Sequence, residues 1–377
     1  MGNRSLKFYI VAGEASGDLH GAHLIKEIKN MHPESDFRCW GGDKMKHEGG
    51  VLVKHISELA FMGFVEVLFN LRTIFKNLRL CKQDILAYRP DALVLIDYPG
   101  FNLRIATWAK AQGIKIHYYI SPQIWAWKQS RVYKIKASID HMYVILPFEK
   151  AFYAKFDYDV EYVGNPLMDV IADHFSKTRT RGVFMIENQL NAEKKIIALL
   201  PGSRKQEIRV KLPIMLKAME SFPEYQLVVA GAPSIEQRFY AAFLNQNTRI
   251  VYGQTYDLLH FSDAALVTSG TATLETAIIG CPQVVCYKGS FVSYVIARLL
   301  IKVNYISLVN LIMNREVVKE LIQQDCSVEK IKGELAKILV EGPERIKLLE
   351  DYRDLKNLLG LGGASKKVAF AVLKTIE

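Results

Sequence analysis

Short apolar runs alternate along the chain with longer segments in which apolar residues recur every three or four positions. The short runs predict buried strands, and the longer spacing predicts helices that pack through one face. Strands are expected at 8–11, 37–40, 93–96, 114–119, 142–146 and 162–163, then at 196–200, 227–230, 250–252, 264–267 and 283–286. Strands separated by amphipathic helices predict an α/β fold with doubly wound parallel sheets.

The two series of strands predict two Rossmann-like domains. They are separated by the sequence VGNPLMDV and a polar stretch at 177–195. We expect an N-terminal domain at 1–165, a second domain at 166–345 and C-terminal helices at 346–377, because strand character fades from Val309 onward. These last helices either pack back on the N-terminal domain or are exchanged in a dimer. A length of 377 residues suits two domains of ordinary size.

Composition places the chain among ordinary globular proteins, with 50% hydrophobic and 23% charged residues. No uncharged apolar stretch is long enough to span a bilayer, and the start has no apolar segment typical of an export signal. The five cysteines form no C-x-x-C motif, which favours reduced thiols. The net charge of +10 indicates a polyanionic partner: nucleic acid, an anionic membrane or phosphorylated substrates.

Candidate chemistry is expected where strands end, because ligands of open α/β sheets collect at the carboxyl ends of the strands. In LVLIDYPGFN (93–102), Asp97 follows a buried strand, and we expect Pro99 and Gly100 to shape the turn. Asp97 is either a turn acid bonded to the backbone near Asn102 or a general base. In VAGEASGDLHG (11–21), Ser16 or Asp18 either caps a helix or contacts a ligand.

Two loops of the second domain predict phosphate binding. In ALLPGSRKQEI, Gly202 and Ser203 turn the chain and Arg204 adds a cation at a helix start, which opposes the helix dipole unless an anion lies there. In VTSGTATLE, the segment 269–271 precedes a helix that carries Glu275. Donors at that helix start suit a diphosphate, and Glu275 either binds a ribose diol or complements the helix dipole.

Basic charge gathers in two segments with apolar or aromatic residues. The segment 59–82 is either a core helix with a solvated basic face or a membrane-binding element, and its apolar content favours the membrane. The segment 121–136 holds Trp125 and Trp127, which either stack on nucleic acid, seat a sugar or acyl chain, or pack in a core. His20 and His23 have no third ligand nearby, so no metal site is expected.

These loops occur in the order typical of one enzyme family. The sequences VAGEASGDLHG, IDYPGFN, SPQIWAWK, LPFE, VGNPL, LLPGSRKQEI, TSGTATLE, GCPQVVCYK and YISLVNLI make the chain resemble lipid-A-disaccharide synthase from about residue 8 to 325. A more distant similarity, chiefly through 270–280, links it to the peptidoglycan N-acetylglucosaminyl transferase.

The resemblance implies a GT-B fold, with two Rossmann-like domains facing each other across a cleft. It implies an inverting transfer, without metal or cofactor, of 2,3-diacylglucosamine from its UDP derivative to the 6-hydroxyl of 2,3-diacylglucosamine 1-phosphate. The products would be a β-1,6-linked disaccharide phosphate and UDP. It also implies a peripheral enzyme on the cytoplasmic face of a Gram-negative inner membrane. Homodimers that exchange C-terminal elements occur in the family.

The resemblance assigns roles to the candidate residues. Asp97 and Glu14 would be catalytic, and Ser16, Asp18, Trp125 and Trp127 would contact the acceptor or sugar. The residues that would bind the nucleotide are Gly202, Ser203, Arg204, Ser269, Gly270, Thr271, Glu275 and Asn310. The residues that would contact the membrane are Leu68, Phe69, Leu71, Ile74 and Phe75. Another UDP-sugar enzyme, such as a peptidoglycan-type transferase or an epimerase, is the alternative. An RNA-binding protein is disfavoured because no RNA-binding motif is present.

Overall fold

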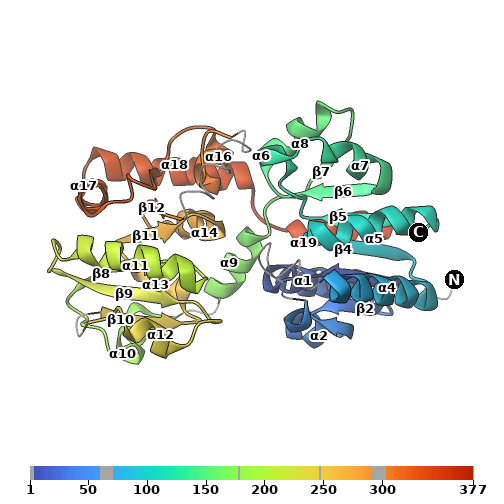
Figure 1. Ribbon diagram of the computed structural model, residues 1–377, viewed down its shortest axis with the longest axis horizontal. Helices are drawn as coiled ribbons and strands as arrows, with labels where there is room; N and C mark the ends of the chain where they lie inside the picture. The colour runs from blue at the N-terminus through green and yellow to red at the C-terminus, as the bar shows by residue number, and fades with distance from the viewer. Residues whose placement is uncertain (1–3, 60–70, 177–178, 246–247, 290–302, 377) are drawn as a thin grey trace. The chain divides into compact units, whose positions relative to one another are not determined.

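The computed structural model describes residues 4–59, 71–176, 179–245, 248–289 and 303–376. The chain forms two compact units (Figure 1): unit 1 comprises Met1–Pro166 and Gly362–Glu377, and unit 2 comprises Leu167–Leu361. The second boundary therefore follows residue 361, whereas the sequence pattern placed it after residue 345. Each unit is an α/β body with one parallel sheet, which confirms the predicted fold class.

Unit 1 contains a seven-stranded sheet in the order β3-β2-β1-β4-β5-β6-β7. Its strands are β1 (Lys7–Ala12), β2 (Asp36–Gly41), β3 (Val51–His55), β4 (Ala92–Ile96), β5 (Ile116–Tyr119), β6 (His141–Val144) and β7 (Glu161–Tyr162). The strand order reverses between β1 and β4, which is the topological switch point where ligands of such sheets bind. Ala12 pairs with Ile96, so the loops that follow these two strands start at the same level.

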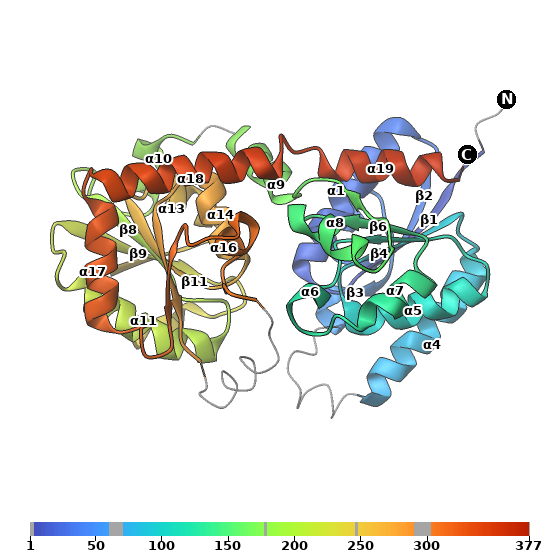
Figure 2. The same ribbon diagram turned by 90° about the horizontal axis from the view of Figure 1, so that it is seen from above.

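Helices cover both faces of this sheet. They are α1 (Ala15–Met31), α2 (Asp43–His47), the 3₁₀ turn η1 (Ile56–Glu58), α4 (Leu71–Tyr88), α5 (Pro99–Ala111), α6 (Ile124–Trp127), α7 (Arg131–Ser138), α8 (Pro147–Ala154) and α19 (Ala364–Lys374). Figure 2 shows α1 and α19 on one face and α4, α5 and α7 on the other. Val368 and Val372 of α19 join Phe8, Ile10 and Ile25 in one buried core, so the end of the chain is part of unit 1.

Unit 2 contains a six-stranded sheet in the order β10-β9-β8-β11-β12-β13, with its switch point between β8 and β11. The strands are β8 (Lys195–Leu200), β9 (Tyr225–Gly231), β10 (Thr248–Tyr252), β11 (Ala264–Thr268), β12 (Gln283–Tyr287) and β13 (Lys319–Ile322). The helices are α9 (Leu167–Ser176), α10 (Arg181–Glu187), α11 (Lys205–Met219), α12 (Gln237–Ala241), α13 (Thr255–Phe261), α14 (Thr271–Ile279), α16 (Leu308–Met313), α17 (Val328–Leu339) and α18 (Pro343–Leu359).

Each predicted strand overlaps an observed strand, but β3 and β13 were not predicted. Both lie at the edge of a sheet. Their side chains are mostly half-buried, and β13 has the sequence KELI. The expectation of helices alone after Val309 is therefore wrong, because an edge strand with one solvated face lacks the continuous apolar run of a buried strand.

Candidate active site

Asp97 lies in the turn between β4 and α5, directly at the switch point of unit 1. Asp97 and Tyr98 are both left-handed, with φ of 45° and 49°. The Asn102 amide donates to the carbonyls of Asp97 (2.8 Å) and Ile96 (3.2 Å), and the Tyr118 hydroxyl donates to the Asp97 carbonyl (2.6 Å). These bonds hold the turn in a conformation that a residue other than glycine seldom adopts.

This turn differs from the sequence expectation in two respects. The Asn102 side-chain amide donates to backbone carbonyls, including that of Asp97, and not to the Asp97 carboxylate. Pro99 opens α5, and Gly100 is exposed with open space around its Cα and no positive φ. The turn is therefore made by Asp97 and Tyr98 and not by Pro99 and Gly100.

Asp97 is half-buried, and the pKa of its carboxyl group is raised from 3.8 to about 6. Burial is the main cause, because it disfavours the charged form, and the negative charge of Glu14 adds to it. A carboxylate with a pKa near 6 is ionised at neutral pH and is a better proton acceptor than an ordinary aspartate. That combination is typical of a general base.

Glu14 and Gly13 belong to the neighbouring loop, between β1 and α1. Glu14 is exposed at the N-cap of α1, and Ser16 is exposed in its first turn. The Tyr98 ring lies over Gly13, so a Cβ atom at position 13 would overlap that ring. The two loops are thus packed against each other, which explains one glycine of the GEASGD motif and brings the Glu14 charge close enough to act on Asp97.

Asp18 has a different place from the predicted sugar contact. It is buried, and its carboxylate accepts the backbone N–H groups of Gly42 (2.7 Å), Met45 (3.1 Å) and Lys44 (3.2 Å). These donors lie at the start of α2, where backbone N–H groups have no partner within the helix. We therefore assign Asp18 to capping α2 and not to binding the sugar.

The two tryptophans of SPQIWAW also separate. Trp125 is buried and its indole N–H donates to Glu149 Oε1 (3.2 Å). Glu149 accepts the Leu146 N–H as well (2.9 Å), and burial raises the pKa of its carboxyl group to about 7. Trp127 is 47% exposed, with the Arg131 guanidinium 5.0 Å from its ring centroid. Of the pair, Trp127 is the one open to a ligand.

At the switch point of unit 2 the two predicted phosphate-binding loops start at the same height along the sheet, because Leu200 pairs with Val267. In the first loop Gly202 has φ of 117°, and the Glu207 side chain folds back against it. Arg204 is the N-cap of α11 with a side chain 67% exposed, and one guanidinium nitrogen lies 3.9 Å from Glu207 Oε1. Lys205 instead places its ammonium 5.7 Å from the Phe239 ring centroid.

The second loop contains Ser269, Gly270 and Thr271. Gly270, with φ of 148°, is the N-cap of α14, and Thr271 is exposed at its start. The Ser269 hydroxyl donates to the Ile306 carbonyl (2.9 Å), so it anchors the loop to the segment before α16. Gly270 and Thr271 are therefore better placed than the Ser269 hydroxyl to donate to an anion.

Glu275 lies one turn into α14. The Tyr256 hydroxyl donates to its Oε1 atom (2.9 Å). Burial raises the pKa of the Glu275 carboxyl group, and the Tyr256 bond opposes that rise. The carboxylate is held on one oxygen by a side chain that the sequence analysis did not identify.

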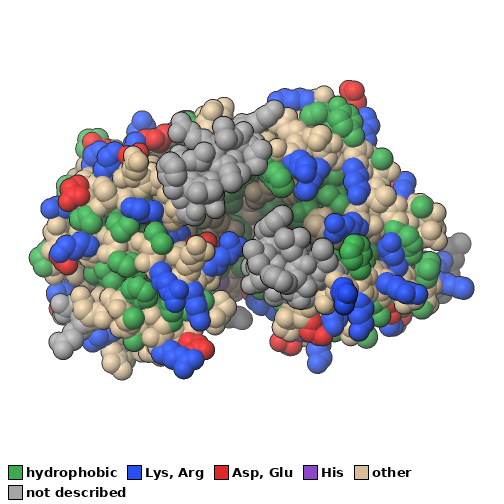
Figure 3. Space-filling view, in the orientation of Figure 1, with side chains coloured by type: hydrophobic (Ala, Val, Ile, Leu, Met, Phe, Trp, Pro, Cys, Tyr) green, Lys and Arg blue, Asp and Glu red, His purple; other side chains and the backbone are tan. Residues whose placement is uncertain are grey.

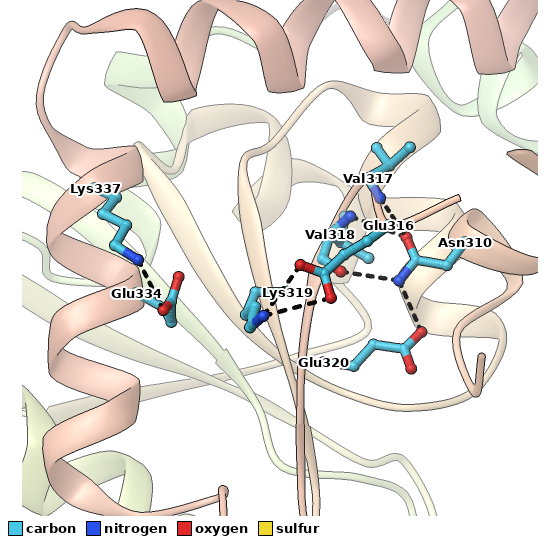
Figure 4. Close-up of polar contacts among 8 residues, drawn as sticks. All are labelled: Asn310, Glu316, Val317, Val318, Lys319, Glu320, Glu334 and Lys337. Carbon is cyan, nitrogen blue, oxygen red and sulfur yellow. Dashed lines mark hydrogen bonds and ion pairs between the residues drawn. The ribbon is translucent and has the colours of Figure 1, made fainter. Parts of the chain in front are cut away.

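Asn310 is buried in a polar network that uses its whole amide group (Figure 4). Its oxygen accepts the N–H groups of Val317 (2.8 Å) and Val318 (2.9 Å), and its nitrogen donates to the Val318 carbonyl (2.9 Å) and Glu320 Oε1 (2.9 Å). Every hydrogen-bonding position of the amide is occupied. Asn310 therefore has a structural role in this network, and its nucleotide contact stays a prediction.

Glu320 was missed because it lies on β13, the edge strand that the apolar pattern did not predict. Its carboxylate accepts the N–H groups of Ile306 (3.0 Å) and Ser307 (2.9 Å) and the Ser307 hydroxyl (2.7 Å). The Ile306 carbonyl is the group that anchors Ser269. Glu320 thus fixes the segment on which the second phosphate loop rests.

The predicted membrane residues are described only in part. Leu68 and Phe69 lie outside the described residues, and Leu71 is the first residue of α4. Ile74 is half-buried, whereas Phe75 is 63% exposed. Figure 3 shows Lys and Arg side chains interspersed with hydrophobic ones on the α4–α5 side of unit 1.

No helix within the described ranges is long and apolar enough to cross a membrane. Among the same residues, no group of three or more His, Cys, Asp or Glu side chains is arranged to hold a metal ion.

Two parallel-sheet units, each with polar loops at its switch point, define the class as GT-B. A UDP-GlcNAc 2-epimerase from Neisseria meningitidis has this fold, with a TM-score of 0.69 and 14% identity over 98% of this chain and 100% of that chain. So does the glycotransferase of kitacinnamycin, with a TM-score of 0.68 and 13% identity over 99% of this chain and 100% of that one. These likenesses establish the fold alone.

The sequence comparisons identify the family. A model of the lipid-A-disaccharide synthetase family matches residues 8–372. The lipid-A-disaccharide synthase of Syntrophus aciditrophicus is 40% identical over 376 residues, covering 98% of this chain and 97% of that protein. That of Nitrosococcus oceani is 40% identical over 375 residues, covering 98% and 96%. The chain belongs to the lipid-A-disaccharide synthase family and is a glycosyltransferase of lipid A biosynthesis, so the predicted family is confirmed and the alternatives are not favoured.

Proposed function

We propose that the chain transfers 2,3-diacylglucosamine from its UDP derivative to the 6-hydroxyl of 2,3-diacylglucosamine 1-phosphate. The products are the β-1,6-linked disaccharide 1-phosphate and UDP. The observation that carries this assignment is the 40% identity with lipid-A-disaccharide synthases over 98% of the chain. Asp97, at the switch point of unit 1, supplies the carboxylate that the reaction needs. Unit 2 carries at its own switch point the glycine turns, the Arg204 cation and the Glu275 carboxylate that suit a nucleoside diphosphate.

In the proposed reaction the Asp97 carboxylate takes the proton from the acceptor 6-hydroxyl. The freed oxygen forms a bond to C1 of the donor sugar while the bond from C1 to the diphosphate oxygen breaks, which inverts the configuration at C1. The left-handed turn holds the backbone of Asp97 through Asn102 and Tyr118, so the backbone that carries the base is in place before the acceptor binds. Glu14 raises the basicity of Asp97 through its negative charge.

The leaving UDP carries the charge that develops in the transition state. We propose that Arg204, Gly202, Ser203, Gly270 and Thr271 hold its diphosphate through backbone donors and one guanidinium, and that Glu275 accepts bonds from the ribose hydroxyls. No metal ion is required in this scheme. Full turnover in excess EDTA is expected, and a loss that Mg²⁺ restores would contradict it.

The acylated substrates suggest where the enzyme works. We propose peripheral association with the anionic cytoplasmic face of an inner membrane, through α4 and the exposed Trp127. Support comes from Phe75, which is exposed on α4 beside the exposed cations Arg72, Lys76 and Arg79. Apolar side chains flanked by cations are typical of helices that lie in the interface of an anionic bilayer.

A homodimer would form, in this proposal, by exchange of α19. The helix fills part of the unit 1 core, so α19 of a second copy would make the same contacts. It follows an exposed Leu361 between Gly360 and Gly362, both with positive φ. Light scattering that shows a dimer which survives dilution supports exchange, and a monomer at all concentrations opposes it.

The proposed activity is tested by following both products with the full-length protein. With donor and acceptor together, UDP and the disaccharide phosphate should appear in equal amounts, and omission of the acceptor should stop UDP release. Conversion of the donor to an isomeric UDP-sugar without acceptor would instead indicate an epimerase. Absence of both reactions, in protein that binds UDP, would contradict the assignment of the substrates.

A further inference from the structure

Tyr256 in the first turn of α13 contacts the proposed ribose carboxylate, yet no part of the proposed mechanism uses it. Its hydroxyl donates to Glu275 Oε1 at 2.9 Å, across from α13 to α14. Both residues are half-buried, so neither is sealed inside the core of unit 2. The bond leaves the Oε2 atom of Glu275 without a partner from Tyr256.

Tyr256 is itself held in place from α9. The His174 ring meets the Tyr256 ring edge-to-face, with centroids 5.3 Å apart. His174 Nε2 lies 2.8 Å from Asp257 Oδ1, and Arg179 donates to Asp257 Oδ2 at 3.0 Å. Asp257 is buried, and burial makes an ion pair costly unless its geometry is well satisfied. These contacts fix the ring, and through the ring they fix the hydroxyl that reaches Glu275.

We infer that Tyr256 is a positioning residue for nucleotide recognition, which aims the Glu275 carboxylate at the ribose hydroxyls. The inference rests on the proposed role of Glu275. A free glutamate side chain samples several rotamers and loses that freedom on binding a diol. A hydrogen bond to one oxygen removes much of this loss in advance and leaves the lone pairs of the other oxygen for the ribose.

The role has a signature that a purely structural contact lacks, because it concerns one part of the nucleotide. The diphosphate is assigned to the loops at 202–204 and 270–271, which Tyr256 does not contact in any hydrogen bond of the described residues. Loss of the Tyr256 hydroxyl should therefore weaken binding only when the ribose offers its hydroxyls. UDP and 2′-deoxyuridine 5′-diphosphate differ only in the 2′-hydroxyl, so their comparison isolates the bond from that hydroxyl to Glu275.

The test is calorimetric titration of the full-length protein with these two ligands. Tyr256→Phe should weaken UDP binding about three- to tenfold, the cost of ordering one glutamate side chain on binding. Its affinity for the deoxy ligand should stay within about twofold of the unsubstituted protein, which itself should bind the deoxy ligand less well than UDP. Tyr225→Phe is the matched control, because Tyr225 is the first residue of β9 and lies at the amino end of the strands of the same sheet. Its affinities for both ligands should be unchanged.

A second background shows whether Tyr256 acts through Glu275. In a Glu275→Ala protein the carboxylate is absent, so adding Tyr256→Phe should cost no further UDP affinity. Equal weakening of both ligands, additive losses in the double variant, or an unchanged UDP affinity would each overturn the inference.

The proposed function fails differently from the inference. If the unsubstituted protein does not bind UDP, the nucleotide site itself is wrong. If it binds UDP and the deoxy ligand equally, Glu275 does not read the ribose, and the inference falls with that assignment. If it discriminates between them but Tyr256→Phe still discriminates as well, only the inference is overturned.

Discussion

Asp97 and Tyr98 are two successive residues with positive φ at the end of β4. Left-handed backbone costs about 1–2 kcal/mol for each residue with a side chain. The Asn102 amide and the Tyr118 hydroxyl offset this cost through bonds to the turn carbonyls. Strain held in this way at the end of a strand is typical of a functional turn, and here the turn presents the Asp97 carboxylate, whose raised pKa suits a base.

Gly13→Ala tests whether the two loops depend on each other at the level of single atoms. A Cβ atom at position 13 would overlap the Tyr98 ring, so the ring and the Asp97 turn must shift. We expect a loss of about 1–3 kcal/mol in the free energy of unfolding, together with a lower turnover. Gly100→Ala is the control, since nothing lies within reach of a Cβ there. Equal behaviour of the two variants in denaturant melts would contradict the packing argument.

Arg204→Ala tests the phosphate assignment. The guanidinium is exposed at the start of α11, so its loss should weaken UDP binding about five- to tenfold in calorimetry. Lys205→Ala removes the same charge one residue further along, but Lys205 faces the Phe239 ring and should change the affinity little. Similar losses in both variants would show that only the overall charge of the helix start matters.

At the scale of elements, the sequence pattern predicts the buried strands and the loops that follow them. Asp97, Gly202 and Gly270 all lie where those strands end, because an apolar run followed by a turn residue marks both features together. The apolar pattern did not predict the edge strands β3 and β13, because one face of each is solvated. Glu320 was not predicted as a site residue because it lies on β13. Asp18, Trp125 and Asn310 have partners within the protein that could not be predicted, because a motif shows which residue is special but not whether its partner is a ligand or another part of the chain.

Asn310→Ala tests the structural role of the network between α16 and β13. The substitution removes the hydrogen-bond partner of the N–H groups of Val317 and Val318 and of the Glu320 carboxylate. The free energy of unfolding should therefore fall by about 2–4 kcal/mol. Glu316→Gln, on the exposed pair with Lys319 in Figure 4, should cost less than about 0.5 kcal/mol. Weaker UDP binding by Asn310→Ala without any loss of stability would restore the predicted nucleotide contact.

Phe75→Ser tests α4 as the membrane-binding element. Removing an exposed phenyl group from the interface should lower affinity for phosphatidylglycerol-containing vesicles about tenfold in a sedimentation assay. Phe370→Ser is closely matched, because Phe370 is 62% exposed on α19 of the same unit, against 63% for Phe75. Vesicle binding that falls equally in both variants would indicate general hydrophobicity and not a site on α4.

At the scale of the whole molecule, the proposal divides the reaction between the two units. Unit 1 supplies the base and the contacts with acylated substrates, and unit 2 holds the nucleotide. The last residues of the chain belong to the unit 1 core, so the chain that begins in one unit also ends there. The sequence offered this return only as one of two alternatives, because an amphipathic helix pattern shows that a helix packs but not on which sheet.

The role of Asp97 as the base is tested most directly by the pH dependence of kcat/KM in the full-length enzyme and two variants. The base works only when ionised, so the rate should rise with pH and reach half its plateau at about pH 6. The acceptor phosphate also titrates near that pH, so the variants assign the inflection. Glu14→Gln removes the charge that raises the Asp97 pKa and should move the inflection to lower pH. Asp97→Asn should lower turnover about 10²–10⁴-fold and keep full UDP affinity. An inflection that stays in place in Glu14→Gln, with near-normal turnover in Asp97→Asn, would contradict the account.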